Sequence, residues 1–225
     1  MKSYRLLIAM FISVLGSAAQ AEADVALITS LEGKVTRVVA TAGTHELQAV
    51  TTGTYELQTF VKVKAGDVLN TTKNSKVQIT YFENGRQESW SGVGKLEITP
   101  TESLATGLPP PKVKQIPLII VKQMAHTPSL DGQERAGVTR LRSIDNAQIL
   151  ITMDETYKKM RMKAGRNDLN PELYLLAGML KLKQWDRVEK TLNELKQTYP
   201  HNQQAEALIA LYSNALRNAM TPPSQ

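Results

Sequence analysis

The spacing of apolar residues changes once along this 225-residue chain, and that change constrains the fold more than any other feature. Over residues 25 to about 99, short runs rich in Val, Thr, Ile and Tyr are separated by Gly, Asn and Asp, which is typical of strands and turns. From about Ile144, apolar residues recur every three or four positions, as in helices. The sequence therefore predicts an α+β protein of two domains, all-β first and helical second.

Three consecutive prolines at 109–111 mark the boundary, because proline fixes φ and lacks the N–H that a sheet or helix requires. We predict a signal peptide over 1–21, a β domain over 22–108, a Pro-rich linker and connecting segment over 109–143, a helical domain over 144–219 and a disordered tail over 220–225. Inside the connecting segment, residues 116–121 are interpreted as a single strand, and the sequence leaves open whether it joins the β domain.

The clearest β-hairpin spans residues 76–90. Val77, Ile79 and Tyr81 alternate with polar residues and are expected to face a core. Asn84 and Gly85 are expected to supply the positive φ angles of a tight turn. Upstream, the pattern of residues 43–48 recurs at 53–58, which we interpret as a duplicated strand that widens a sheet, with a paired ligand groove using Tyr55 as the alternative.

Four helices are predicted after the connecting segment. The first carries on one face Ile149, Met153, Tyr157, Met160 and Ala164. The second begins with Asn170 as N-cap and Pro171 at the first helical position. The third runs from about 186 to 199 and is ended by Pro200. The fourth carries Ala205, Leu208, Ile209, Tyr212 and Leu216.

The N-terminus has the pattern of a cleavable secretory signal. Lys2 and Arg5 precede an apolar run over 6–15, and small residues follow up to Ala21. The run is shorter than the roughly 20 residues that span a bilayer. We therefore expect cleavage near Ala21 and a periplasmic or otherwise exported protein, with a retained anchor as the alternative.

Composition narrows the chemistry that the chain is expected to perform. Without cysteine, disulfides and thiolate sites are excluded. Aromatic residues make up 5% of the chain and no basic stripe is interleaved with them, so nucleic acid is not an expected partner. His45, His126 and His201 have no accompanying nucleophile motif or metal-ligand spacing, and residues 92–95 lack the spacing of a phosphate loop. We expect no enzymatic activity, no metal site and no cofactor.

Two features point to binding surfaces. Five cations fall within nine residues of the first predicted helix: Lys158, Lys159, Arg161, Lys163 and Arg166. They are interpreted as a solvated face, with docking to an anionic lipid headgroup or an acidic protein as the alternative. Trp90 is interpreted as a core or edge aromatic, with stacking on a sugar or peptide as the alternative.

Four short patterns give the β half a family resemblance: LEGKV at 31–35, AGDVL at 65–69, SKVQI at 75–79 and FENG at 82–85. In this order and spacing, residues 25–100 resemble the FecR-like periplasmic domain. The resemblance implies an all-β module of antiparallel strands, a β-sandwich or roll, which senses or binds partners in the envelope and has no catalytic residues.

The helical half resembles a degenerate tetratricopeptide repeat. The residues that carry this resemblance are Tyr174, Gly178, Trp185, Asp186, Leu192 and Pro200. It implies antiparallel helices that leave a groove for a partner segment. Tyr174 and Trp185 thus join Tyr55, Trp90 and the five cations as candidate partner-binding residues.

Together these features predict an exported envelope adaptor without catalytic activity. The expected partners are envelope proteins, with peptidoglycan or an anionic lipid surface as alternatives, and the oligomeric state is left open. One alternative function is a ligand or cell-wall sensor that relays its state to a membrane partner. Another is an envelope hydrolase.

Overall fold

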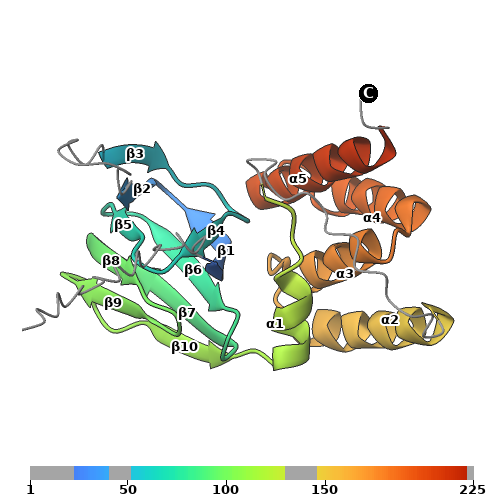
Figure 1. Ribbon diagram of the computed structural model, residues 1–225, viewed down its shortest axis with the longest axis horizontal. Coiled ribbons are helices and arrows are strands. Elements are labelled where there is room, and N and C mark those ends of the chain that lie inside the picture. The colour runs from blue at the N-terminus through green and yellow to red at the C-terminus, as the bar shows by residue number, and fades with distance from the viewer. Residues whose placement is uncertain (1–22, 41–51, 130–145, 222–225) are drawn as a thin grey trace, which may run out of the picture.

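The computed structural model describes residues 23–40, 52–129 and 146–221. Within these residues, ten strands come first and five helices follow, with all strand pairs antiparallel (Figure 1). The predicted α+β arrangement, all-β and then helical, is therefore confirmed. The predicted signal peptide over 1–21 lies outside the described residues, as does most of the predicted tail.

The strands form two five-stranded sheets. Sheet A has the order β10 (Lys112–Gln115), β7 (Arg86–Ser91), β6 (Lys76–Tyr81), β1 (Asp24–Glu32), β4 (Lys62–Lys64). Sheet B has the order β3 (Thr52–Glu56), β2 (Val35–Ala40), β5 (Val68–Thr71), β8 (Gly94–Ile98), β9 (Ser103–Thr106). Apolar side chains from both sheets share one buried cluster, so the sheets form a sandwich.

The hairpin of β6 and β7 follows the predicted alternation. Val77, Ile79 and Tyr81 are buried in the sandwich core. In the turn only Gly85 has a positive φ, of 72°, so the prediction of a second positive φ at Asn84 is wrong. Asn84 instead uses its side chain, which accepts a hydrogen bond from the N–H of Arg86 and donates one to the carbonyl of Thr101.

The second copy of the repeated pattern lies at an edge of sheet B, and the duplicated-strand interpretation stays a prediction. This copy forms β3, which pairs only with β2 among the described strands and therefore widens sheet B at its edge. The first copy, at 43–48, lies outside the described residues.

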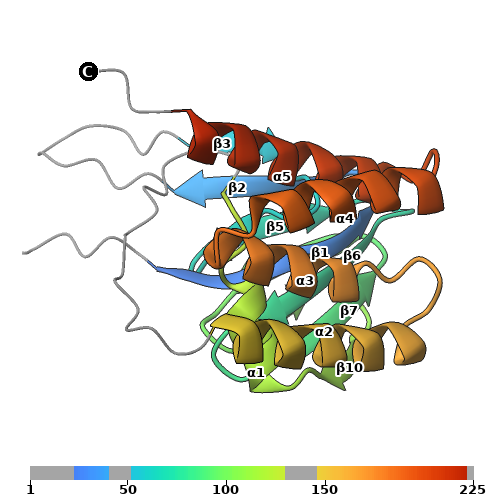
Figure 2. The same ribbon diagram turned by 90° about the vertical axis from the view of Figure 1, so that its right-hand side faces the viewer.

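The helices are α1 (Leu118–Met124), α2 (Asn146–Lys163), α3 (Asn170–Lys181), α4 (Trp185–Thr198) and α5 (Gln203–Met220). Figure 2 shows α5, α4, α3 and α2 side by side in that order, with α1 between them and the sandwich. The four predicted helices are thus confirmed. None of the helices in the described part of the chain combines the length and hydropathy needed to span a bilayer.

Three details of the predicted segments are wrong. Residues 116–121 do not form a strand, because Pro117 ends the extended chain and α1 starts at Leu118. The predicted linker therefore contains a strand, β10, and a helix. The N-cap of α3 is Leu169 and not Asn170, whose N–H is bound by the carboxylate of Asp168. On α2, Ile149 is exposed and Leu150 packs against the helical core in its place.

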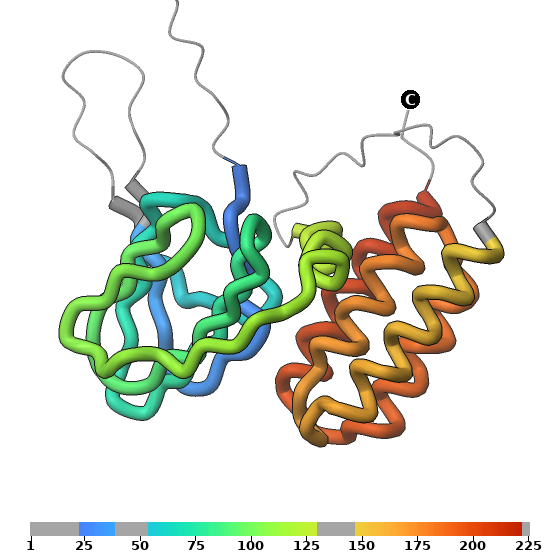
Figure 3. The backbone as a smooth tube through the Cα atoms, turned by 90° about the horizontal axis from the view of Figure 1, so that it is seen from below, coloured from blue at the N-terminus to red at the C-terminus, as the bar shows by residue number. Residues whose placement is uncertain are grey.

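The outer face of sheet A joins the sandwich to the helices. Leu27 and Phe60 belong to the same buried cluster as Ile120 and Val121 of α1 and the core residues of α3, α4 and α5. A hydrogen bond of 2.6 Å from Gln204 Nε2 on α5 to Ser30 Oγ on β1 crosses the same interface. Figure 3 shows α1 lying between the two halves. The halves are therefore one packed unit.

Replacing Phe60 by alanine tests this coupling. Because the ring is 1% exposed and bridges both halves, Phe60→Ala should lower the free energy of unfolding by about 3 kcal/mol. In a Trp185→Phe background, Trp90 fluorescence reports the sandwich and far-ultraviolet circular dichroism reports the helices. Both signals should shift together in urea. Tyr55→Ala, at an exposed aromatic, should leave them unchanged, and two separate transitions would contradict the single unit.

Alanine substitutions at two separate glycines test whether the β6–β7 turn must approach the chain after β10 closely. At Gly85 a Cβ atom would collide with the carbonyl oxygen of Ile116, whereas at Gly66, whose φ is also positive, nothing lies within 4 Å. Gly66→Ala should cost about 1 kcal/mol from backbone strain alone, and Gly85→Ala about 3 kcal/mol from strain plus the clash. Urea unfolding of both variants measures the difference. Equal losses would show that the close approach to Ile116 is not required.

Candidate functional site

The helical half contains a groove between α2 and α4, with α3 as its floor. We call it the α2–α4 groove, and its volume is about 280 Å³. The floor consists of Leu175 and Met179 of α3. The walls are formed by Asp154, Tyr157 and Lys158 of α2 and by Arg187, Lys190, Thr191 and Glu194 of α4. The groove therefore combines an apolar floor with charged walls.

The sequence of α3 explains why a groove forms here. This helix is buried on almost every side, as expected for the centre of a helical layer. Gly178 allows the close approach of its neighbours, because a Cβ atom there would collide with Met153 Sδ of α2 and press on the side chain of Gln123. Thus α2 and α1 pack on one part of α3, and Leu175 and Met179 remain as the floor between α2 and α4.

One ion pair crosses the groove from wall to wall. Arg187 Nη2 of α4 lies 2.5 Å from Asp154 Oδ1 of α2, and both side chains are more than a third exposed. A second, longer pair joins Lys190 and Glu194 within α4, at 3.9 Å. Exposed pairs of this kind contribute only about 0–1 kcal/mol. A charged group of a binding partner can therefore replace either pair at little cost.

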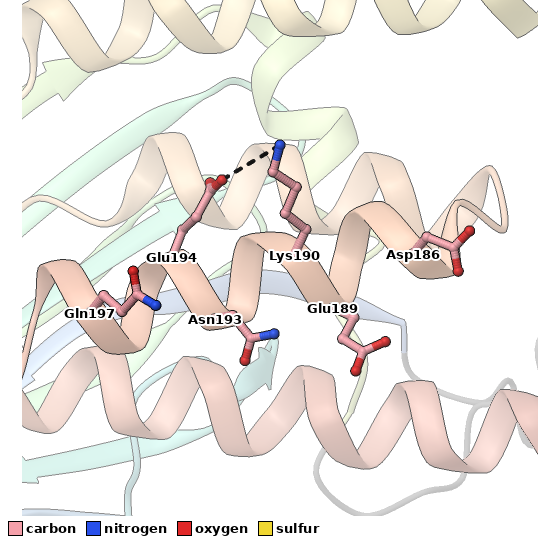
Figure 4. A pocket seen from close by; sticks show the side chains of 6 residues that line it. All are labelled: Asp186, Glu189, Lys190, Asn193, Glu194 and Gln197. Carbon is pink, nitrogen blue, oxygen red and sulfur yellow. Dashed lines mark ion pairs between the residues drawn. The ribbon is translucent and has the colours of Figure 1, made fainter.

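A second depression lies along α4 and adjoins the groove. It has a volume of about 460 Å³ and is lined by polar residues of this helix alone: Asp186, Glu189, Lys190, Asn193, Glu194 and Gln197. Figure 4 shows Lys190 and Glu194 extending from α4 on the side of α3, where they also line the α2–α4 groove. The two depressions therefore form one continuous surface.

Arg161 holds one end of the helical layer together. Its Nη1 donates hydrogen bonds to both carboxylate oxygens of Glu172, at 3.1 and 3.0 Å, and to the hydroxyl of Tyr199 at 3.2 Å. It also donates to the carbonyl of Asp168, at 2.8 Å. Glu172 is 4% exposed, so Arg161 supplies the hydrogen bonds and the opposite charge that its buried carboxylate requires. Arg161 therefore links α2 to α3 and to the end of α4.

Tyr157 completes the same cluster from α2. Its hydroxyl donates a hydrogen bond to Glu172 Oε1, at 3.3 Å. Burial and the neighbouring carboxylate raise the pKa of Tyr157 to about 12, so the phenol stays protonated and remains a donor at neutral pH.

The five predicted cations separate into different environments. Arg161 is engaged with Glu172 and its side chain is 25% exposed, so it departs from the predicted solvated face, whereas docking by these cations stays a prediction. Lys158 lines the α2–α4 groove. Lys159 and Lys163 on α2 and Arg166 beyond it are exposed. The separation arises because successive helical residues point about 100° apart.

The four aromatic residues that were predicted to bind a partner also lie in different environments. Trp90 is 5% exposed and its ring N–H donates a hydrogen bond to Glu88 at 2.9 Å, so it is a core residue and its ring is not available to stack on a ligand. Tyr174 is buried in the helical cluster and outside the groove lining. Trp185 is the first residue of α4 and is partly buried. Tyr55, on β3, is 65% exposed.

Sequence reasoning missed the floor and one wall of the groove. Leu175, Met179 and Arg187 were not among the expected binding residues. The signal for the floor is present, because α3 is apolar around most of its circumference and such a helix packs on more than one side. Nothing local identifies Arg187, since its partner Asp154 lies 33 residues earlier.

The histidines described by the structure lie apart from the groove. His126 Nε2 is 2.9 Å from Lys181 Nζ, and His201 lies in the turn between α4 and α5 with a positive φ of 62°. His45 lies outside the described residues. Across residues 23–40, 52–129 and 146–221, no group of three or more metal-ligating side chains is placed to hold a metal ion.

No family model, no curated protein and no solved structure matches this chain. The resemblances to the FecR-like domain and to the tetratricopeptide repeat therefore remain predictions that rest on the residues quoted for them.

Removal of Arg161 should destabilise the helical layer strongly. Arg161→Met leaves the buried carboxylate of Glu172 without its partner, and we expect the free energy of unfolding to fall by about 3 kcal/mol. The control Lys159→Met, two residues earlier on the exposed side of α2, should change it by less than about 0.5 kcal/mol. Urea unfolding measures both. If the double variant Arg161→Met/Glu172→Gln were no more stable than Arg161→Met, the buried charge would not be the cause.

Proposed function

We propose that this protein is an exported envelope adaptor that binds a segment of another protein in the α2–α4 groove and does not catalyse a reaction. The observation that carries the proposal is the groove itself, which has an apolar floor of Leu175 and Met179 between two walls that each carry both positive and negative side chains. Buried apolar anchors supply most of the energy of protein interfaces, and surrounding charges provide selectivity.

The open shape of the groove, more than its volume, favours a partner's side chains over a small ligand. Pockets that enclose a drug-sized molecule have volumes of about 300–1,000 Å³ and bury most of its surface. The α2–α4 groove, at about 280 Å³, is smaller, and it continues into the polar depression along α4. This shape suits a segment that inserts one or two apolar side chains and lays its polar part along α4.

The rigid connection between the halves supports an adaptor. Because Phe60 and Leu27 share a buried cluster with the helices, a partner bound in the groove is held in a fixed orientation relative to the sandwich. Tyr55 on the edge strand β3 offers an exposed aromatic for a second partner. An adaptor needs such a fixed geometry between two binding surfaces.

The FecR-like assignment of the sandwich is part of this proposal, and the quoted patterns have clear structural roles. Gly33 has φ 73° in the turn between β1 and β2. Asp67 accepts a hydrogen bond from the N–H of Lys64 at 2.7 Å and pairs with Arg37 at 2.8 Å, which fixes the turn before β5. Three of the four patterns thus contain turns, which explains the choice of Gly, Asp and Asn within them.

The tetratricopeptide-like assignment and the export of the chain are further parts of the proposal. Gly178 has the packing role that a small residue needs at a helix crossing, which supports the repeat. Export rests on the basic, apolar and small residues that succeed one another over 1–21.

Site-specific crosslinking in intact cells tests the adaptor. A photoreactive amino acid in place of Lys158 or Lys190, on opposite walls of the groove, should give the same discrete protein adduct. The same amino acid in place of Lys73, exposed in a turn of the sandwich, serves as control and should not give it. Lys190→Glu should reduce the Lys158 adduct severalfold, because it reverses a charge of the opposite wall.

Other outcomes favour the rival functions. If no adduct forms and cell-wall fragments raise the melting temperature of the purified protein, the chain is a ligand sensor. A hydrolytic activity that is lost in His126→Ala or His45→Ala would identify an envelope hydrolase. Either result would reject the adaptor.

A further inference from the structure

Four elements line one side of the molecule: β9, β10, α1 and α2, at the bottom of Figure 1. Figure 3 looks onto this side, where the chain from β9 to α1 lies in front of the sandwich. The lower end of the row of helices is α2, so the side of α2 turned away from α3 belongs to the same surface. We call this surface the β9–α2 face.

Most of the exposed large apolar side chains lie on these elements. Of the ten described residues of this kind, seven belong to β9, β10, α1 or α2. Ile119 of α1 is 70% exposed and Met162 of α2 is 79% exposed. The others include Leu104, Val113, Leu118 and Ile151. Two of the seven point elsewhere, because Ile149 lies on another side of α2 from Ile151 and Val113 points to the opposite face of sheet A from Lys112 and Lys114. The exposed apolar side chains of the helical part of the face are Leu118 and Ile119 of α1 with Ile151 and Met162 of α2, and a cluster of this kind is unusual for a surface that contacts only water.

The spacing within the helices confirms that these side chains share exposed faces. On α1, Ile120, Val121 and Met124 are buried, and the opposite face therefore presents Leu118, Ile119 and Lys122. On α2, Leu150, Met153 and Tyr157 pack toward the helical core. The positions opposite them are Ile151, Lys159, Met162 and Lys163, all exposed.

The charge of the face is predominantly positive. The sequence contains no Asp or Glu between Glu102 and Asp131, whereas Lys112, Lys114 and Lys122 lie in that interval and are exposed. With Lys159 and Lys163 of α2 the face has five lysines. Within the described residues, none of the five lies within ion-pair distance of a carboxylate. One exposed carboxylate, Glu155, lies on the face itself, because it is four residues from both Ile151 and Lys159, and the exposed Glu83 and Glu102 lie in adjoining turns.

We infer that the β9–α2 face docks on an anionic membrane surface. Aliphatic side chains that insert at the boundary between headgroups and acyl chains, together with lysines that reach the headgroups, are the features of interfacial binding. Each lysine near an anionic surface contributes about 1 kcal/mol. Five lysines and several aliphatic groups together are therefore sufficient for reversible attachment.

The composition of the face argues against a protein as its occupant. The cores of protein interfaces are enriched in aromatic residues and Arg and depleted in Lys. The exposed apolar residues on these four elements include no aromatic, and all five cations are lysines. The membrane is a different occupant from the protein segment proposed for the groove, although the two surfaces adjoin at Lys158 of α2, so the inference goes beyond the proposed function.

Vesicle sedimentation tests the inference with the full chain, in the form recovered after export. Binding to vesicles of phosphatidylcholine with phosphatidylglycerol is compared with binding to phosphatidylcholine alone. We expect the chain to bind the anionic vesicles and release them at high salt. The triple variant Lys112→Glu/Lys114→Glu/Lys122→Glu should bind them at least about tenfold more weakly.

Matched controls separate the face from the overall charge. The variant Lys34→Glu/Lys73→Glu/Lys183→Glu changes the net charge equally at exposed lysines elsewhere, and it should retain binding. Leu118→Ser/Ile119→Ser should weaken binding, whereas Val93→Ser, at an exposed apolar residue in the β7–β8 turn, should not. Equal loss in test and control variants would overturn the inference, as would binding to an acidic protein but not to vesicles. The groove variant Lys190→Glu should bind vesicles normally, which keeps this result distinct from the crosslinking result.

Discussion

The ring of Phe60 joins the sandwich to the helices, and the relative placement of all other surfaces depends on it. Phe60 has φ 66°, a left-handed conformation that costs a bulky residue about 1–3 kcal/mol. Its N–H donates a 2.7 Å hydrogen bond to the carbonyl of Ile28, which fixes the backbone in that conformation. Burial of an aromatic ring contributes about 1.5–3 kcal/mol, and the helical core supplies the apolar surroundings. The strain is therefore tolerated because it directs the ring out of the sandwich and into the helices.

The sequence predicts the elements that follow from local periodicity, and it fails where an element depends on this contact between the halves. The β6–β7 hairpin and the four long helices follow from local periodicity, since Val77, Ile79 and Tyr81 alternate and the helical stripes recur every three or four residues. Residues 116–121 are a short apolar run, which periodicity alone cannot divide between strand and helix. The core between the halves decides, because a helix there buries Ile120, Val121 and Met124 together. The predicted linker therefore forms a helix because it contacts residues that are distant in the sequence.

The candidate site shows the same division between local and distant information. A run of cations on one helix predicts a charged face, yet Arg161 turns inward because Glu172, eleven residues later, lies buried on α3. A similar arrangement occurs in the sandwich, where the fully buried Glu88 binds Arg86 at 2.6 Å and the ring N–H of Trp90. No sequence motif identifies the hydrogen-bond partners of either glutamate. In a chain without cysteine, each half thus has a buried carboxylate whose satisfied hydrogen bonds favour one arrangement of its neighbours.

The position of α2 connects the two proposed binding surfaces. Asp154, Tyr157 and Lys158 of this helix line the α2–α4 groove, and Ile151 and Met162 of the β9–α2 face lie seven residues before and four residues after Lys158, so the two surfaces adjoin along α2. A segment held in the groove would therefore lie close to the headgroups, in an orientation that the Arg161 cluster fixes at one end. The adaptor and the membrane-docking surface are thus mutually compatible, because a partner anchored in the same membrane would reach the groove with a short segment.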